Sequence, residues 1–224
     1  MQQRSLEIAC FSLEAAQIAA KAGAHRIEFC VNKMEDGLSP TLQELEQLLH
    51  QIDVAVHVML RPRGGNFVYT EKEFEWMKSY LLEAKKLPIT GFVFGCLNQN
   101  NVVNKEQNSL LVALAGELPC TFHKAIDEVE DMDQGLEDII ACGFSYVLSS
   151  GGKPSALAGK DVLKVMHKQA NGRIVIMPGG GIRSTYLEEI ITYTEASWVH
   201  SSAILDGGEM PDAAEIKKLL TCLN

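Results

Sequence analysis

Two arginines that follow an apolar stretch are the first residues of this sequence whose types and spacing could do chemistry. The segment from His57 to Leu60 has the composition of a buried strand, and it continues into Arg61 and Arg63, which are separated by a proline and followed by two glycines. Proline fixes φ and glycine admits backbone shapes that other residues avoid, so both arginines should leave the strand at set angles. Two guanidinium groups placed there can form a receptor for an anion. The alternative is a turn in which they bind only neighbouring carboxylates.

A histidine followed by an aspartate is the second candidate. His123 ends an apolar segment that begins at Pro119, and Asp127 follows four residues later. An imidazole with a nearby carboxylate can act as an oriented acid–base pair. The alternative is a histidine that is only hydrogen-bonded within the core.

Two glutamates interrupt otherwise apolar strands, at Glu7 and Glu28. A charge inside a core is costly unless it is paired. Both glutamates therefore either face partners such as Arg61 in a shared interior or point outward into helix contacts, and an ion pair that only fixes the packing is a further alternative. Because side chains alternate along a strand, Glu28 shares a face with Cys30. If these faces point inward, a carboxylate and a thiol would meet Arg61 and His123 near the strand ends.

Exits rich in glycine and serine follow the last three predicted strands. They contain Ser150, Gly151, Gly179, Gly180, Gly181, Ser201 and Ser202. Backbone N–H groups in such exits can bind a phosphate group, and in strand–helix barrels the last strands often supply the phosphate site. Glycine-rich exits also occur in barrels that bind no phosphate, so ordinary turns are the alternative.

The six cysteines are scattered and include no Cys-x-x-Cys pair, which disfavours a zinc cassette or a thioredoxin-like motif. Cys10 and Cys30 end the first two predicted strands, and soft thiolates suit Cu(I). Cys10 has the opposite strand parity to Glu7, so the two face the same side only if the strand ends before Cys10. The alternative is that these cysteines are small buried apolar residues, as most free cysteines are.

These residues need a scaffold that brings strand ends together. The hydrophobic pattern predicts eight strands, each followed by an amphipathic helix. The strands are expected at 6–10, 26–30, 54–60, 91–97, 119–123, 146–152 with its glycine exit, 173–177 and 197–202. Eight such units in this length predict an α/β fold, a (β/α)8 TIM barrel that forms a single domain over residues 1–224. A doubly wound open sheet is the alternative, but no Gly-x-Gly-x-x-Gly motif follows the first strand.

Composition limits the classes of partner. Apolar residues make up 46% of the 224 residues, and the formal net charge is −9. This charge argues against a general nucleic-acid binder, because phosphate neutralisation needs a basic face; local clusters of lysine and arginine still allow a small anionic ligand. The N-terminus lacks the apolar run of a signal peptide and no stretch is long enough to span a bilayer, so we expect a cytoplasmic protein without a membrane partner. A homo-oligomer is compatible with the sequence.

Several of these motifs resemble those of a known family. They are His57–Phe67 with its Arg61–Gly65 loop, Thr121–Asp127, Glu7–Cys10, Gly23–Cys30, Leu148–Gly152, Met177–Gly181 and His200–Ala203. In this order they resemble the copper homeostasis protein CutC family. The resemblance implies a cytoplasmic barrel linked to copper handling, with copper as the cofactor and Cys10 and Cys30 as the proposed Cu(I) ligands. Asn66, Lys124 and Ile126 stand where that family usually has Asp, Arg and Phe.

Three functions follow from these observations. The first, favoured by the resemblance, is a copper homeostasis protein that binds the copper ion through cysteine thiolates. The second is a barrel enzyme that acts on a small anionic substrate, phosphorylated or not, at the carboxyl ends of the strands. In that case the two arginines would hold the anion, His123 with Asp127 or Glu28 would transfer protons, and Glu7 would belong to the same catalytic set. The third is an interaction protein whose polar strand ends only hold the barrel together.

Overall fold

Strands and helices alternate along the part of the chain that the computed structural model describes, residues 4–205 and 207–223. The strands are β1 (Ser5–Cys10), β2 (Arg26–Phe29), β3 (Ala55–Met59), β4 (Gly91–Phe94), β5 (Cys120–Phe122), β6 (Tyr146–Ser149), β7 (Val175–Pro178) and β8 (Trp198–Ser201). The helices are α1 (Leu13–Ala22), α2 (Leu42–Leu49), α3 (Glu71–Ala84), α4 (Lys105–Ala115), α5 (Met132–Ala141), α6 (Lys160–Ala170), α7 (Ser184–Thr194) and α8 (Ala213–Leu223). Short 3-10 helices at Lys33–Glu35 and Lys124–Glu128 follow β2 and β5.

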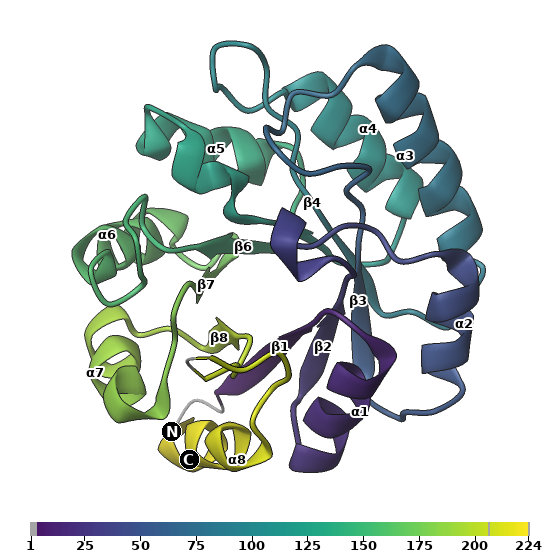
Figure 1. Ribbon diagram of the computed structural model, residues 1–224. Coiled ribbons are helices and arrows are strands. Elements are labelled where there is room, and N and C mark those ends of the chain that lie inside the picture. Colours follow the sequence, from purple (N-terminus) through teal and green to yellow (C-terminus); the bar gives the residue numbers. More distant parts are fainter. Residues whose placement is uncertain (1–3, 206, 224) are drawn as a thin grey trace.

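All eight strands belong to one parallel sheet, in the order β7-β6-β5-β4-β3-β2-β1-β8. Consecutive strands are therefore neighbours, and each intervening helix carries the chain back to begin the next parallel strand. The two ends of this order lie against each other, because a Cβ added to Gly179, just after β7, would be 3.2 Å from the Cβ of His200 in β8. The helices surround the strands as a ring (Figure 1). The predicted (β/α)8 TIM barrel is confirmed.

Reciprocal capping boxes mark the starts of α2 and α3. Thr41 and Thr70 accept hydrogen bonds from the backbone N–H groups of Glu44 and Glu73, and both glutamates bond back to the cap residue. These reciprocal bonds satisfy N–H groups that have no partner within the first helical turn. At the end of α1, Gly23 adopts a left-handed φ of 98°, which ends the helix and turns the chain toward β2.

The predicted strand over 91–97 is wrong in its length, because β4 ends at Phe94. The side chain of Asn108 in α4 accepts a hydrogen bond from the N–H of Cys96 (3.0 Å) and donates one to its carbonyl group (2.8 Å). Leu97 pairs instead with Val103 in an antiparallel bridge. The apolar composition of this segment does not reveal that a helix side chain replaces the neighbouring strand as its hydrogen-bond partner. The prediction over 146–152 included the glycine exit, and β6 itself ends at Ser149. The remaining strands differ from their predicted bounds by one or two residues.

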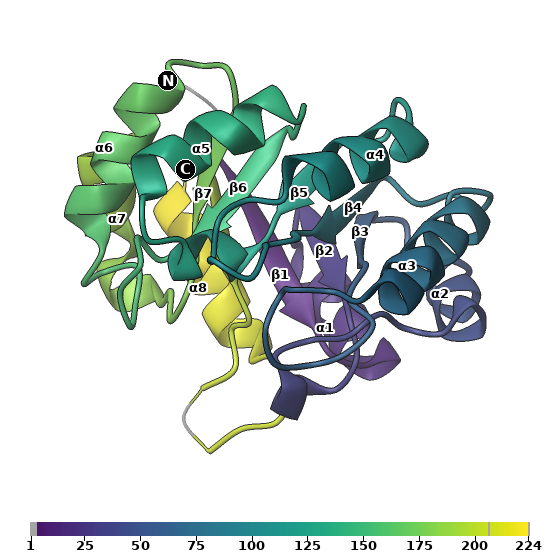
Figure 2. The same ribbon diagram turned by 90° about the horizontal axis from the view of Figure 1, so that it is seen from above.

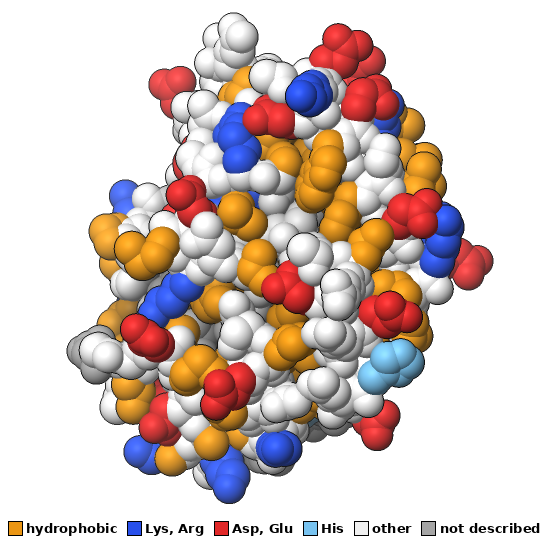
Figure 3. All heavy atoms as spheres, turned by 45° about the vertical axis from the view of Figure 1, so that its right-hand side comes forward, with side chains coloured by type: hydrophobic (Ala, Val, Ile, Leu, Met, Phe, Trp, Pro, Cys, Tyr) orange, Lys and Arg blue, Asp and Glu red, His pale blue; other side chains and the backbone are white. Residues whose placement is uncertain are grey.

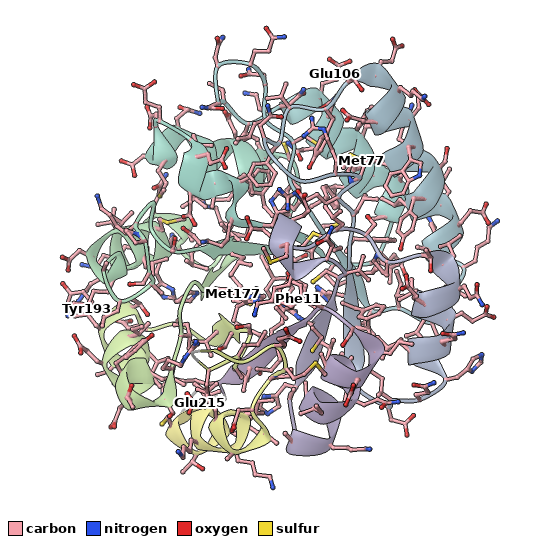
Figure 4. The ribbon with its side chains drawn as sticks, in the orientation of Figure 1. Phe11, Met77, Glu106, Met177, Tyr193 and Glu215 are labelled. Atoms are coloured by element: carbon pink, nitrogen blue, oxygen red, sulfur yellow. The ribbon has the colours of Figure 1, made fainter. Side chains whose placement is uncertain are left out.

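The outer face of the sheet and the inner faces of the helices share an apolar core. Ile8, Phe29, Phe92 and Phe122 are fully buried in it. Burial of these surfaces is the main force that holds the helices on the barrel. Figure 4 shows the two sides of the sheet: Met77 lies on α3 in the outer layer, whereas Met177 of β7 lies inside the ring.

The inside of the barrel is polar. Its buried polar residues include Glu7, Arg26, Glu28, His57, Thr121 and His200. Glycines on neighbouring strands leave room for the imidazole rings: Gly91 lies against the ring of His57, and a Cβ on Gly95 would be 2.9 Å from ring atoms of His123. Glycine is needed at these two positions because a side chain would collide with the imidazole rings. Backbone conformation is not the reason, since neither φ angle is left-handed.

The loops at the carboxyl ends of the strands form one side of the molecule. Figure 2 shows the segments that follow β2 and β8 extending on this side. On the face formed by α2, α3 and α4, hydrophobic side chains lie among acidic and basic ones (Figure 3). Within the described residues, no helix combines the length and the apolar character needed to cross a membrane.

Candidate functional site

A cavity opens at the carboxyl ends of the strands. Its volume is about 560 Å³, which is within the usual range for a small-molecule site. It is lined by Ala9, Phe11, Glu28, Asp36, Met59, Arg61, Gly65, Phe67, His123, Lys124, Asp127, Glu128, Leu148, Gly180, Gly181, His200, Ser201 and Ser202. Phe11 lies near the centre of the ring of helices (Figure 4). Polar groups from distant parts of the sequence therefore face one space, at the end of the barrel where function is usually found.

An ion network lies inside the barrel next to this cavity. Arg26 Nε donates to Glu7 Oε2 at 2.5 Å, and His200 Nδ1 is 2.7 Å from Glu7 Oε1. The Arg26 guanidinium also lies over the rings of Tyr146 and Trp198, with its Cζ 4.3 and 4.0 Å from their centroids. Burial alone would raise the pKa of Glu7, but Arg26 and His200 together hold this pKa well below its usual range. Glu7 is therefore a carboxylate at neutral pH, and Arg26 is the partner that supplies its opposite charge.

Glu28 is buried without such a partner. Its side chain lines the cavity, and its Oε2 has no hydrogen-bond partner among residues 4–205 and 207–223. Burial raises the pKa of Glu28 to about 7; Glu7 acts in the same direction, whereas His200 and Arg26 oppose it. Burial disfavours the protonated form of His200, but the charges of Glu28 and Glu7 outweigh this and raise its pKa. Near neutral pH, Glu28 can therefore both accept and donate a proton.

His123 lines the cavity as a neutral hydrogen-bond donor. Burial, reinforced by the charge of Arg61, lowers its pKa to about 3. Its Nδ1 accepts a hydrogen bond of 3.3 Å from the N–H of Ala125, so the proton of the neutral ring is on Nε2. This Nε2 has no partner in the described part of the chain. The predicted pairing of His123 with Asp127 is not present among the hydrogen bonds of the described residues.

Arg61 reaches the cavity, but most of its donors are used. Its terminal nitrogens donate to the carbonyl groups of Glu35 (2.5 Å), Gly37 (3.2 Å) and Gly65 (2.9 Å). Its Cζ also lies 4.9 Å from the centroid of the Phe67 ring. Only its Nε lacks a partner among the described residues. Arg61 therefore holds the loops after β2 and β3 together at the cavity mouth.

Arg63 points away from the cavity and stabilises its own loop. Its Nε donates to Glu73 in α3 at 2.7 Å, and its terminal nitrogens donate to the carbonyl groups of Asn66 (2.8 Å) and Val68 (2.7 Å). Asn66 also accepts a hydrogen bond from Arg63 through its side-chain oxygen (3.2 Å). The two arginines are thus not brought together as the expected anion receptor.

Asp127 occupies the exit of β6. Its carboxylate accepts hydrogen bonds from the hydroxyl of Ser149 (2.6 Å), the N–H and hydroxyl of Ser150 (2.9 and 2.8 Å) and the N–H of Gly152 (2.9 Å). The N–H of Gly151 donates to the hydroxyl of Ser149 (2.8 Å). The donors predicted to bind phosphate at Ser150 and Gly151 are therefore engaged within the chain.

The exit of β7 is different, because its donors are not used. Gly180 and Gly181 line the cavity with left-handed φ angles of 98° and 70°. Their N–H groups make no hydrogen bond within the described residues. Gly179, by contrast, donates its N–H to the carbonyl of Ser149 (2.9 Å) and is not part of the cavity wall.

The end of β8 adds two serines to the wall. The hydroxyl of Ser201 donates to the carbonyl of Ile182 (3.0 Å) and accepts from the N–H of Ala203 (3.0 Å). The hydroxyl of Ser202 accepts a bond of 3.4 Å from the N–H of Ile204, which leaves its own proton able to turn toward a ligand. Ser202 is therefore the more available of the two.

The two cysteines predicted to bind Cu(I) do not line the cavity. β1 continues through Cys10, so this thiol points to the opposite side of the sheet from Glu7 and packs in the outer apolar core. Cys30 packs inside the barrel against Met59. Each thiol donates to a backbone carbonyl, and burial, reinforced by the charge of Glu28, raises both pKa values. Two protonated thiols on opposite faces do not fit a site in which two thiolates hold one copper ion.

A different group of metal-ligating side chains comes together inside the barrel. One ligand atom each from Glu7, Glu28 and His200 lie within 4.8 Å of one another. Oxygen and imidazole ligands do not favour Cu(I) over harder cations. Both oxygens of Glu7 are already bonded, one of them to Arg26, which supplies the positive charge at this place.

Three residues that the sequence analysis did not assign to the site complete it: Arg26, His200 and Lys124. Strand parity was a usable signal, since Arg26 shares a face with Glu28 and His200 shares one with Ser202. The pairing of Glu7 with Arg26 and with His200 depends on the register of β1 against its two neighbours. Register between parallel strands is not visible in the sequence of either strand.

Comparisons with known proteins agree with one another. A family model described as "CutC family" matches residues 4–205. The chain is 41% identical over 198 residues to the "Copper homeostasis protein cutC homolog" of Mus musculus, which covers 88% of this chain and 73% of that protein. The protein of the same description from Homo sapiens is 40% identical over 198 residues, covering 88% of this chain and 72% of that protein. The crystal structure of a CutC protein from Streptococcus agalactiae matches with a TM-score of 0.83 at 30% identity, covering 89% of this chain and 98% of that one.

Proposed function

The chain belongs to the CutC family, and from the geometry of its cavity we propose that it is an enzyme that moves a proton on a small anionic substrate. One observation carries this proposal. Glu28 and His123 line the same cavity, each is less than a tenth exposed, and each keeps a polar atom without a partner among the described residues. The Nε of Arg61 in the same cavity is a third such atom. Buried polar atoms are normally hydrogen-bonded, so three exceptions in one cavity favour a ligand as the missing partner.

The two side chains suit complementary roles. The Glu28 carboxylate would take a proton from a substrate carbon next to a carbonyl group, and the Nε2–H of His123 would donate a hydrogen bond to the carbonyl oxygen as negative charge develops there. Where the first carbon carries a hydroxyl group, Glu28 would then return the proton to the former carbonyl carbon while the hydroxyl proton passes to the former carbonyl oxygen. The substrate is thus isomerised without net gain or loss of protons. His200, held by Glu7, would remain beside Glu28 and favour its ionised form.

Proton exchange with solvent tests this proposal directly. The wild-type protein is incubated in D2O with a panel of small hydroxycarbonyl acids and phosphate esters, and loss of C–H signals is followed by NMR. Where exchange occurs, Glu28→Gln should abolish it and His123→Ala should slow it by about 10²-fold or more, the typical effect of losing a donor to an oxyanion. Glu128→Gln is the matched control, because Glu128 lines the same cavity but is exposed. Undiminished exchange in Glu28→Gln would contradict the proposal.

Copper binding through Cys10 and Cys30 is the second candidate, favoured by the name "copper homeostasis protein" that the relatives carry. It requires both buried thiols to ionise and Cys10 to leave the outer core. Anaerobic titration of Cu(I) against a chromogenic chelator tests it with Cys10→Ser and Cys30→Ser. One tight equivalent that both variants lose would support this role, and binding that neither variant changes would exclude it. The cytoplasmic setting stays a prediction, supported by six unpaired cysteines.

A further inference from the structure

The exits of β6 and β7 are neighbours in the barrel, and they differ in what their hydrogen-bond donors bind. At the exit of β6, hydroxyl and N–H groups surround the carboxylate of Asp127. This arrangement demonstrates that the exit geometry of this barrel suits an anion. At the exit of β7, Gly180 and Gly181 line the cavity, and their N–H groups make no hydrogen bond within the described residues.

A cation lies beside the free exit. Lys124, in the short helix after β5, lines the cavity, and its side chain is 46% exposed. Its Nζ would be 3.6 Å from a Cβ added to Gly180, and it is 3.9 Å from the nearer carboxylate oxygen of Asp127, which is a weak ion pair. The ammonium group therefore lies between the exit of β6, where Asp127 binds the donors, and the exit of β7, where the N–H groups of Gly180 and Gly181 are unbonded within the described residues.

The ammonium group of Lys124 makes only a weak ion pair with Asp127 among the described residues, whereas most hydrogen-bond donors of Arg61 are already used. Arg61 directs its terminal nitrogens at three backbone carbonyl groups. In a chain with a net charge of −9, an anionic ligand needs a local cation to reach this cavity.

We propose that the N–H groups of Gly180 and Gly181, the hydroxyl of Ser202 and the ammonium group of Lys124 bind the phosphate group of a small phosphate monoester. This inference rests on the proposed function, because it names the class of substrate. The phosphate lies at the exits of β7 and β8, and the rest of the molecule extends toward Glu28 and His123 on the walls formed by β2 and β5. A cavity of about 560 Å³ limits the substrate to the size of a sugar phosphate.

Calorimetric titration with a matched pair of probes tests the site. sn-Glycerol 3-phosphate should bind to the wild-type protein and glycerol should not, since they differ only in the phosphate group. Lys124→Met should weaken binding of glycerol 3-phosphate by about tenfold or more, the effect of losing one hydrogen bond to a charged group. Lys153→Met is the control: this lysine is exposed, lies in the loop after β6 and is not part of the cavity wall, so its loss should change binding by less than about twofold at fixed ionic strength.

Equal binding of the two probes, or equal weakening by Lys124→Met and Lys153→Met, would overturn the phosphate site. The proposed function fails separately. Glu28→Gln should retain the binding of glycerol 3-phosphate, because Glu28 is not among the phosphate ligands. Phosphate binding that depends on Lys124, together with proton exchange that does not depend on Glu28, would leave the site standing and refute the acid–base role. Proton exchange that depends on Glu28, together with glycerol 3-phosphate binding that does not depend on Lys124, would refute the phosphate site alone.

Discussion

Replacing Glu28 by glutamine should stabilise the protein above neutral pH, although it removes the proposed acid–base group. Burial raises the pKa of this carboxyl from 4.5 to about 7. A carboxyl whose pKa is raised on folding contributes stability that is fully present below about pH 4.5 and is lost as the pH rises through its folded value. This difference between the unfolded and folded pKa values of Glu28 corresponds to a free energy on the order of 3 kcal/mol. The wild-type protein loses this stability when Glu28 ionises, whereas the Glu28→Gln variant has no carboxyl group to ionise and keeps it.

Urea unfolding followed by circular dichroism, at about pH 5 and about pH 8, measures this difference. Glu28→Gln and the wild-type protein should have similar free energies of unfolding at the lower pH, and the variant should be more stable at the higher pH. Glu7→Gln is the matched comparison, with the same substitution inside the same barrel. Since the pKa of Glu7 is held low, its carboxylate stabilises the fold above its ordinary pKa, and this contribution is lost only as the pH falls through the folded value. Its removal leaves Arg26 buried without a partner and should cost about 3–5 kcal/mol near pH 8.

The opposite signs of these two effects are the test. If Glu28→Gln were destabilising near pH 8 to the same extent as Glu7→Gln, Glu28 would be a paired structural carboxylate. The argument that its Oε2 lacks a partner until a ligand binds would then be refuted.

Three further substitutions test other parts of the barrel. Arg26→Met should lower the free energy of unfolding by about 3–5 kcal/mol, because it leaves the Glu7 carboxylate buried and unpaired; urea titration measures this, and the double variant with Glu7→Gln should recover part of the loss. Gly95→Ala should cost about 1–3 kcal/mol, since the new Cβ would be 2.9 Å from the ring of His123, and a change in Tm too small to reflect that cost would show that the ring moves freely. Asp127→Asn should cost about 1–3 kcal/mol, because an amide NH2 group would face N–H donors at the exit of β6; an unchanged Tm would contradict the role given to this carboxylate.

The barrel could be predicted from the sequence because its repeating unit is local. Each strand and the helix after it carry their own hydrophobic pattern, and each unit lies beside the next. The alternation of side chains also indicated correctly that Glu28 and His123 share the interior with Arg61, since all three line the cavity. These expectations use only the spacing of residues within one strand.

The partners of these residues could not be predicted in the same way. Arg61 gives its donors to carbonyl groups of the loop after β2, and no sequence pattern shows that a backbone group will compete with a ligand for a guanidinium. Asp127 binds the exit of the following strand and not His123, because the short helix over Lys124–Glu128 directs it there. Cys10 faces outward because β1 runs one residue further than a shared site with Glu7 would need. Each case depends on loop conformation or on where a strand ends.

The carboxylate of Asp127 has a consequence for how the cavity takes up a ligand. A turn rich in glycine and serine has many accessible conformations when free, and fixing them at the moment of binding weakens affinity. Here the bonds from Ser149, Ser150 and Gly152 to Asp127 fix the wall between β5 and β6 before any ligand arrives. The Asp127 carboxylate thus preorganises part of the cavity wall through intramolecular hydrogen bonds. Uptake at this wall should therefore proceed as rigid docking, with a heat-capacity change set by the buried surface of the ligand and not by ordering of the loop.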